Sequence, residues 1–538
     1  MKVLRRRRFL LPLLVVALGA VLRLYALGAE SLWTDELITV NFVMGMTAPE
    51  LLVRIPQTQP HLPLYYVLLD LWIGLAGSST TAMRLLSALF GIGSVGAFYA
   101  LGRHLVDQEV GLVASLLLAL SSFHVYYAQE VRMYSLLTFL TITSFYALVR
   151  FRESPTRRTG VAYLLLAVAV ASTHFFGIFV VAAQMTYLAV RLDSLADDRL
   201  LGLPVRRLQQ GYATAALVSP FVIIGVVSLL DHVPRYHYIP YPSLWGVVTT
   251  ITEYLGYPEG TEPFAIVGLF CLFVGTATLA FVRFDAADRQ SVVSSLRSPK
   301  FGIGDDEDRD ALTLAALWFA VPFGGPLVLS YLVTPLFWPR YTIAASTGLL
   351  LLVAMGVRNL PRGQLRVAVA ILLAVSLVPS TALYHTQTDK EQWRAVGTTI
   401  EQDAEPGDYV LVVDRITARG VRYYSDRSDI TIRGVAVEGS GTGRDPAPTS
   451  KFENSTDSRD RIWVVFSHAP DSERRRVLNV VNDSRTMVRH EQYEKVELYL
   501  FVSEGNQSSS RATVPDAPRA TNRPTQASRQ RQGFAAPL

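Results

Sequence analysis

Long apolar segments that are almost free of charged residues recur along most of this chain, and they constrain its fold more than any other feature. Half of the 538 residues are hydrophobic and only 18% are charged. A helix needs roughly 20 apolar residues to cross about 30 Å of hydrocarbon. Eleven segments approach this length, at residues 9–22, 85–102, 110–128, 133–149, 161–173, 175–190, 211–230, 263–282, 311–333, 341–357 and 367–384. The sequence therefore predicts a polytopic α-helical membrane protein of about eleven spans.

The first apolar segment follows the basic stretch MKVLRRRR, which suits either a secretory signal or a retained membrane helix. The repeated apolar segments behind it favour a retained first span. Arginines crowd the ends of the apolar segments, which is the usual signature of membrane orientation, so the net charge of +5 does not indicate nucleic-acid binding. Cys271 is the only cysteine, which excludes an intrachain disulfide and zinc sites of the CxxC type.

The positive-inside rule decides two ambiguous places. Residues 62–77 carry Asp70 near their centre, where a carboxylate costs about 2.5 to 3.5 kcal/mol, so we predict a helix that lies in the membrane interface. Residues 161–190 would be about 45 Å long as one helix and would place the basic loops beside them on opposite faces. We therefore predict two crossings that meet near His174.

This topology gives a cell-membrane protein with a cytoplasmic N-terminus and an extracytoplasmic C-terminal domain; few cysteines and many arginines favour a prokaryotic plasma membrane. The runs YVLVV, IWVVF and VELYLFV read as strands of a small α/β domain. Beyond them the composition predicts disorder. The predicted parts are a transmembrane domain at 1–384 with a first outer loop at 29–84, the α/β domain at 385–503 and a disordered tail at 504–538.

Ionisable residues gather on the outer face beside the membrane. Carboxylates can act as bases, and arginines can hold a phosphate. Each residue also has a simpler explanation, because carboxylates can cap a helix, arginines can anchor at the interface, and the histidines lack metal-ligand spacing. Their convergence at one depth favours a site that binds a phosphate-bearing lipid and activates a hydroxyl. The residues are Asp35, Glu36, His61, Arg84, Glu130, Arg132, His174 and Arg340.

Six segments in chain order resemble the membrane glycosyltransferases of the GT-C fold in family 39. These segments are SLWTDE, QPHLPLYYVLL, TAMRLLSALFG, YYAQEVRMYSLL, THFFGIFVVAAQ and WPRY. The similarity is to bacterial and archaeal relatives of protein O-mannosyltransferases and of the aminoarabinose lipid A transferase, and it covers residues 9–400. It implies transfer of a sugar from a polyprenyl or dolichyl phosphate to an acceptor hydroxyl on the extracytoplasmic face, with inversion.

The resemblance also implies roles for the outer-face residues. Asp35 matches the family's catalytic aspartate and would deprotonate the acceptor, with Glu36 and Glu130 as supporting acids. Arg84 matches an arginine at the start of the second span. The substrate-binding residues implied are Arg84, Arg132, Arg340, His61 and His174. The chain has His-Leu-Pro-Leu at 61–64 where relatives usually have His-Pro-Pro-Leu. This departure weakens the case for a substrate-binding role of His61. Some GT-C enzymes use a divalent metal near the acidic pair, and these residues leave that open.

Two other classes compete with this interpretation. A lipid or glycan transporter or flippase would also be polytopic and basic inside, but transporters tend to place ionisable groups near the midplane. A non-catalytic scaffold that displays the outer domain would not need the acidic pair. The sequence has no Walker motif and no suitably placed GxGxxG, so a nucleotide-sugar donor is not expected. The expected partners are the membrane, a lipid-phosphate-linked sugar and a protein, lipid or glycan acceptor, with no nucleic acid.

Overall fold

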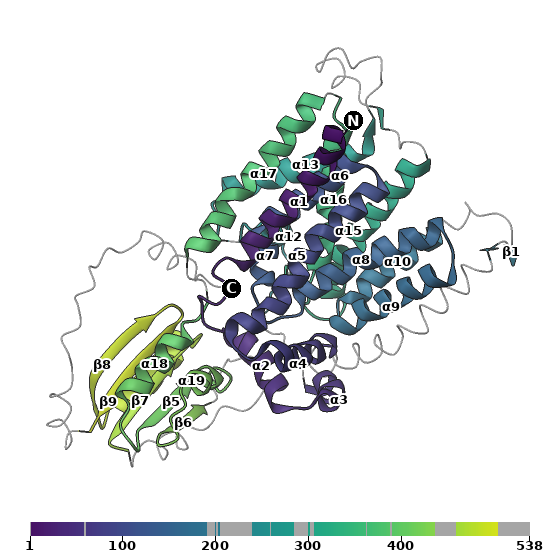
Figure 1. The fold of residues 1–538 in the computed structure, drawn as a ribbon. Coiled ribbons are helices and arrows are strands. Elements are labelled where there is room, and N and C mark those ends of the chain that lie inside the picture. The colour runs from purple at the N-terminus through teal and green to yellow at the C-terminus, as the bar shows by residue number, and fades with distance from the viewer. Residues whose placement is uncertain are drawn as a thin grey trace.

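The computed structural model has two parts, a long helical bundle and a small sheet domain that lies at one end of it (Figure 1). The predicted span at 211–230 and the predicted tail at 504–538 lie outside the described residues. The structure describes residues 2–58, 61–190, 199–200, 203–204, 239–258, 260–283, 300–301, 306–361, 363–387, 390–435 and 459–503.

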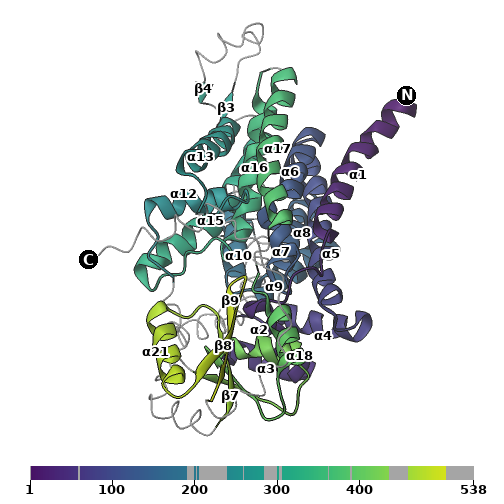
Figure 2. The ribbon, with the colours of Figure 1, turned by 90° about the vertical axis from the view of Figure 1, so that its left-hand side faces the viewer.

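The bundle is built around α16, whose residues from Ile343 to Val357 are all buried. Helices α15, α13 and α6 pack against it. Helix α17 lies at the outside of the bundle in Figure 1, and α1 lies at the outside in Figure 2. The bundle helices are α1 (Lys2–Leu24), α5 (Thr80–Leu105), α6 (Gln108–Leu120), α7 (Ser122–Ala128), α8 (Tyr134–Glu153), α9 (Arg157–Thr173), α10 (Gly177–Val190), α12 (Leu244–Glu253), α13 (Pro263–Thr278), α15 (Asp306–Leu332), α16 (Ile343–Asn359) and α17 (Gly363–Thr386).

The apolar helices make the chain a multi-pass membrane protein. Within the described ranges, five helices are long and apolar enough to cross a membrane, or six if α6 and α7 form one span. Shorter apolar helices add to these, at Leu10–Leu24, Leu64–Ala76, Gly177–Val190 and Ile343–Asn359. The number eleven therefore stays a prediction. The predicted break near His174 is confirmed, because α9 ends at Thr173 and α10 begins at Gly177.

Three further helices lie together at the end of the bundle that carries the sheet domain (Figure 1). They are α2 (Thr34–Gly45), α3 (Ala48–Thr58) and α4 (Leu64–Ala76). Helix α4 forms where the sequence predicts an interfacial helix, and it packs on α2, α3 and α5. The position of α4 relative to a membrane interface stays a prediction.

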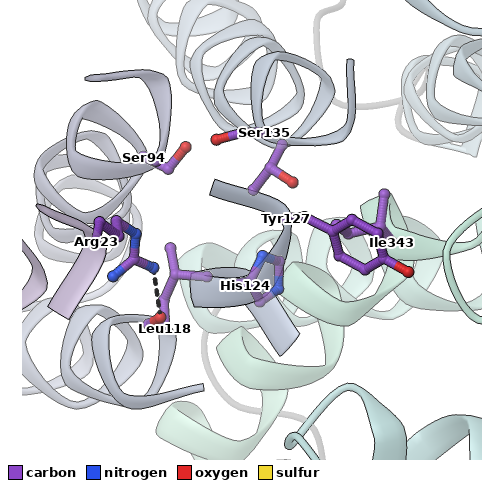
Figure 3. Close-up of a pocket in the computed structure, with 9 residues that line it drawn as sticks. Arg23, Ser94, Leu118, His124, Tyr127, Ser135 and Ile343 are labelled. Atoms are coloured by element: carbon purple, nitrogen blue, oxygen red, sulfur yellow. Dashed lines mark hydrogen bonds between the residues drawn. The ribbon is translucent and has the colours of Figure 1, made fainter. Parts of the chain in front are cut away.

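One expected span, 110–128, is bent by 64° between α6 and α7. The Ser121 hydroxyl accepts from the His124 amide and so caps α7. The buried Arg23 guanidinium of α1 donates to two carbonyls at the end of α6. The acceptors are Leu118 at 3.0 Å (Figure 3) and Ala119 at 3.2 Å. These bonds satisfy carbonyls that the bend leaves without helical partners, which is why a polar side chain is tolerated here. The small space beside Arg23 and His124 would hold about one water molecule.

The C-terminal domain is a five-stranded sheet in the order β6-β5-β7-β9-β8. Strand β5 runs parallel to β6 and β7, while β9 is antiparallel to β7 and β8. The three strands predicted from sequence are confirmed as β5, β7 and β9, whose continuous apolar runs suit strands buried on both faces. The elements are α18 (Trp393–Asp403), β5 (Tyr409–Val413), α19 (Ala418–Tyr424), β6 (Thr431–Val435), β7 (Arg461–Phe466), α21 (Asp471–Asn482), β8 (Thr486–Tyr493) and β9 (Val496–Val502).

Helices cover both faces of this sheet. Trp393 and Val396 of α18, with Val421 of α19, pack on one face, and Val477 and Val481 of α21 pack on the other. Five short segments complete the described part of the fold, namely η3 (Leu279–Phe281) and the strand pairs β1 (Arg199–Leu200) with β2 (Leu203–Pro204) and β3 (Val282–Arg283) with β4 (Lys300–Phe301). The sheet domain meets the bundle through α19, which contacts α2.

Candidate active site

The acidic pair lies in the first turn of α2, where the bundle meets the sheet domain. The two neighbouring carboxylates have different surroundings. The Glu36 side chain is completely buried, whereas the Asp35 side chain is 24% exposed. Because successive residues of a helix point about 100° apart, one carboxylate faces the interior and the other faces an accessible site.

Glu36 is held by a full set of donors. Arg84 donates from Nε to Oε1 at 2.9 Å and from Nη2 to Oε2 at 2.7 Å. The backbone amides of Val131 and Trp33 also donate to it, and Lys390 Nζ lies 3.4 Å from Oε2. Burial alone would raise the pKa of Glu36, but Arg84 and Lys390 more than offset this and lower it to about 2. Glu36 is therefore ionised at every physiological pH, and it ties together three separate parts of the chain.

Arg84 is equally committed. Besides binding Glu36, its terminal nitrogens donate to the carbonyls of Leu27, Glu30 and Ser31. All three nitrogens of this guanidinium thus donate within the protein, and the side chain is only 2% exposed. These contacts fix the loop before α2, and the phosphate-holding role expected of Arg84 from the sequence stays a prediction.

Asp35 faces two other arginines. Arg340 Nη1 donates to Asp35 Oδ2 at 3.1 Å, and Arg132 Nη2 lies 3.9 Å from the same oxygen. Arg132 also donates to the Thr39 hydroxyl at 2.9 Å and to the Asp35 carbonyl at 3.3 Å, which fixes its guanidinium against α2. The Nε atoms of Arg132 and Arg340 have no hydrogen-bond partner among the described residues. A partly exposed carboxylate between two such arginines can act as a base beside a bound anion.

The two histidines adjoin this arginine pair. Arg132 Nη2 donates to His61 Nε2 at 3.0 Å, and the rings of His61 and His174 lie 5.7 Å apart. His174 Nδ1 accepts from the Phe176 amide, so the neutral ring carries its hydrogen on Nε2. Burial, with Arg132 and Arg340 nearby, lowers the pKa of His174 to about 3. His174 is therefore a neutral donor whose Nε2 has no partner in the described parts of the chain.

Glu130 completes the set of residues predicted from sequence. It is fully buried, and burial raises its pKa to about 7 although Lys390 Nζ lies 3.9 Å from Oε1. All eight predicted residues thus fall in one network around α2. The sequence analysis missed Lys390, whose ammonium is buried between Glu36 and Glu130, because nothing in the KEQW run indicates that its first residue reaches back to the acidic pair. In the described ranges, no group of three or more His, Cys, Asp or Glu side chains is arranged to hold a metal ion.

Known proteins share this fold. Residues 58–224 match the family of dolichyl-phosphate-mannose-protein mannosyltransferases. The structure is similar to that of ArnT from Cupriavidus metallidurans bound to undecaprenyl phosphate, with a TM-score of 0.54 at 15% identity over 91% of this chain and 97% of that one. The oligosaccharyltransferase of Archaeoglobus fulgidus gives a TM-score of 0.48 at 9% identity over 84% of this chain and 67% of that one. No curated protein sequence matches.

The similarity to ArnT shows the GT-C fold that the sequence predicts, and the family match over residues 58–224 supports a membrane glycosyltransferase. Both findings agree with the resemblance to the protein O-mannosyltransferases and the aminoarabinose lipid A transferase that the sequence shows.

Proposed function

We propose that this enzyme transfers a sugar from a polyprenyl- or dolichyl-phosphate donor to an acceptor hydroxyl on the extracytoplasmic face of the membrane, with inversion at the anomeric carbon. The donor class is supported by the ArnT structure, which holds undecaprenyl phosphate, and by the name of the matching family. The observation that carries the proposal is the contrast within the acidic pair. Glu36 is buried under five contacts, whereas Asp35 is partly exposed beside two arginines.

Asp35 acts as the base in this proposal. Its carboxylate takes the proton of the acceptor hydroxyl as the hydroxyl oxygen bonds to the anomeric carbon, and the bond between that carbon and the phosphate oxygen breaks. The electron pair of the broken bond stays on the phosphate. Attack from the side opposite the leaving group inverts the anomeric carbon. The acceptor is a protein, lipid or glycan hydroxyl.

The leaving phosphate gains negative charge in this step and needs donors that are already in place. Arg132 and Arg340 can supply them, since their Nε atoms are buried and have no partner among the described residues. His174 can add a neutral donor from Nε2 without placing a third positive charge beside Asp35. Arg84 and Glu36 hold the loop and helix that carry Asp35, and Glu130, with a pKa near 7, is a further acid behind them.

The test is transfer of labelled sugar from a polyprenyl-phosphate donor by the protein in liposomes. Asp35→Asn should lower turnover by about 10² to 10⁴-fold, the usual contribution of a general base, and leave folding intact. Asp70→Asn is the matched control, because Asp70 lies on α4 outside the network, and it should transfer at the wild-type rate. Full transfer by Asp35→Asn would contradict the role of Asp35 as the base. No transfer by well-folded wild type from any lipid-phosphate sugar would contradict the whole proposal and favour a lipid or glycan transporter.

A further inference from the structure

We propose that Lys390 and Glu391, which lead from the bundle into the sheet domain, are positioning residues for the acidic pair. The sheet domain thereby helps to orient the proposed active site. The proposal rests on the role proposed above for Asp35. Neither residue touches Asp35 directly. They act on its neighbours Thr34 and Glu36, one on each side along α2.

The first contact caps the N-terminus of α2. The residue at the N-cap is Trp33, whose indole can only donate, so no side chain there satisfies the free amides of the first turn. Glu391 performs this task from 357 positions away. Its Oε2 accepts from the Thr34 amide at 3.0 Å and from the Thr34 hydroxyl at 2.6 Å. A carboxylate at this end also complements the helix dipole. Thr34 immediately precedes Asp35, so this cap fixes the backbone that aims the proposed base.

The second contact balances charge. Lys390 is almost fully buried, and its Nζ lies 3.4 Å from Glu36 Oε2 and 3.9 Å from Glu130 Oε1. It also donates to the Gln129 carbonyl at 3.1 Å. Arg84 supplies one positive charge to a site that contains two buried carboxylates. Lys390 supplies the second positive charge. Without Lys390, one of the two buried carboxylates would have no counterion whenever Glu130 is ionised.

The sheet domain holds these two residues in place. His468, which follows β7, lies with Nε2 2.5 Å from Glu391 Oε1. Arg394 of α18 donates to the carbonyls of Gly28 and Ala29, and the Leu32 amide donates to the Tyr424 hydroxyl of α19. The loop that leads into α2 is therefore held by α18, α19 and the end of β7 together. Movement of the domain away from the bundle would release all of these contacts at once.

Hydrogen exchange on the full-length protein tests the positioning without any assay of activity. Glu391→Ala should speed exchange of the amides at residues 32–37 by about fivefold, as expected for a lost helix cap. The rest of the bundle and the sheet should keep their protection. Glu391→Gln, which can still accept from Thr34, should lie close to wild type. Glu405→Ala is the matched control, because Glu405 is an exposed carboxylate of the same domain and forms its ion pair with Arg461 of the sheet. Unchanged exchange in Glu391→Ala would overturn the inference.

Measurements of sugar transfer test the proposed role of the positive charge on Lys390. Lys390→Met should lower kcat at least tenfold with little change in KM, and should move the acidic limb of the pH–rate profile upward, because loss of a cation raises the pKa of neighbouring carboxylates. Lys390→Arg should recover most of the rate. Arg422→Met, which removes an exposed cation of the same domain, is the control. A merely structural lysine would lower the yield of folded protein but leave kcat and the pH profile of the folded fraction unchanged, and that result would overturn the inference.

The two proposals fail in different ways. Wild type that transfers no sugar, or Asp35→Asn that transfers normally, contradicts the proposed function, while altered exchange in Glu391→Ala still supports the positioning of α2. Inactive Asp35→Asn combined with normal exchange in Glu391→Ala and normal kinetics in Lys390→Met contradicts only the inference about the sheet domain.

Discussion

Two adjacent carboxylates should differ strongly in how much stability the protein loses when each is replaced by its amide. Replacing Glu36 by Gln keeps the shape of the side chain but removes the charge that Arg84 and Lys390 share. Both cations are at least 97% buried, so neither can be solvated by water in exchange. Breaking a buried ion pair by removing one partner costs about 3 to 5 kcal/mol. We therefore expect Glu36→Gln to lower the free energy of unfolding by this amount.

The same substitution at position 35 should cost little. Asp35 is 24% exposed and Arg340 is 18% exposed, and ion pairs that reach solvent contribute about 1 kcal/mol or less. Denaturant titration of both variants in the same detergent measures the difference, while sugar transfer by Asp35→Asn reports on the base. The reasoning would be refuted if Glu36→Gln unfolded at the wild-type midpoint or if Asp35→Asn proved the less stable of the two.

Two further predictions concern stability. Burial raises the pKa of Glu130 to about 7, so the native state binds its proton more tightly than the unfolded chain, and stability should fall by about 3 kcal/mol as pH rises from 4.5 to 7. The free energy of unfolding should be measured against pH for wild type and for Glu130→Gln. The variant should lack this fall in stability, because its side chain does not titrate. Gly256 has φ +90°, and a Cβ atom added to it would lie only 1.7 Å from Ser122 Oγ. Gly256→Ala should lower the free energy of unfolding by about 1 to 3 kcal/mol, as measured by thermal unfolding. Gly260→Ala is the control, because a Cβ there meets no atom within 4 Å and should cause no steric clash.

Features of this protein that depend on neighbouring residues could be predicted from the sequence. The strands of the sheet domain follow from short apolar runs, and the break near His174 follows from the arginines that flank residues 161–190. The acidic pair stands out because a charge next to an apolar segment needs a reason. In each case the signal lies within about one element of the feature that it predicts.

Features that depend on distant residues could not be predicted in this way. The bend between α6 and α7 needs Arg23 of another helix to bind the carbonyls of Leu118 and Ala119. The carbonyl partners of Arg84 could not be predicted either, because an arginine at the start of a span looks the same in the sequence whether it holds a phosphate or a loop. Lys390 lies 354 positions from Glu36, and no pattern in a single sequence connects them.

That separation along the chain has a consequence for biosynthesis. The ribosome adds about 5 to 20 residues per second, so roughly 20 to 70 s pass between synthesis of Glu36 and synthesis of Lys390, 354 positions later. Throughout this interval the nascent helix α2 lacks both its cap and one of its counterions. The proposed active site is therefore among the last parts of the molecule to mature. On our proposal, a chain that is truncated before residue 390 would insert its membrane helices but would not transfer sugar.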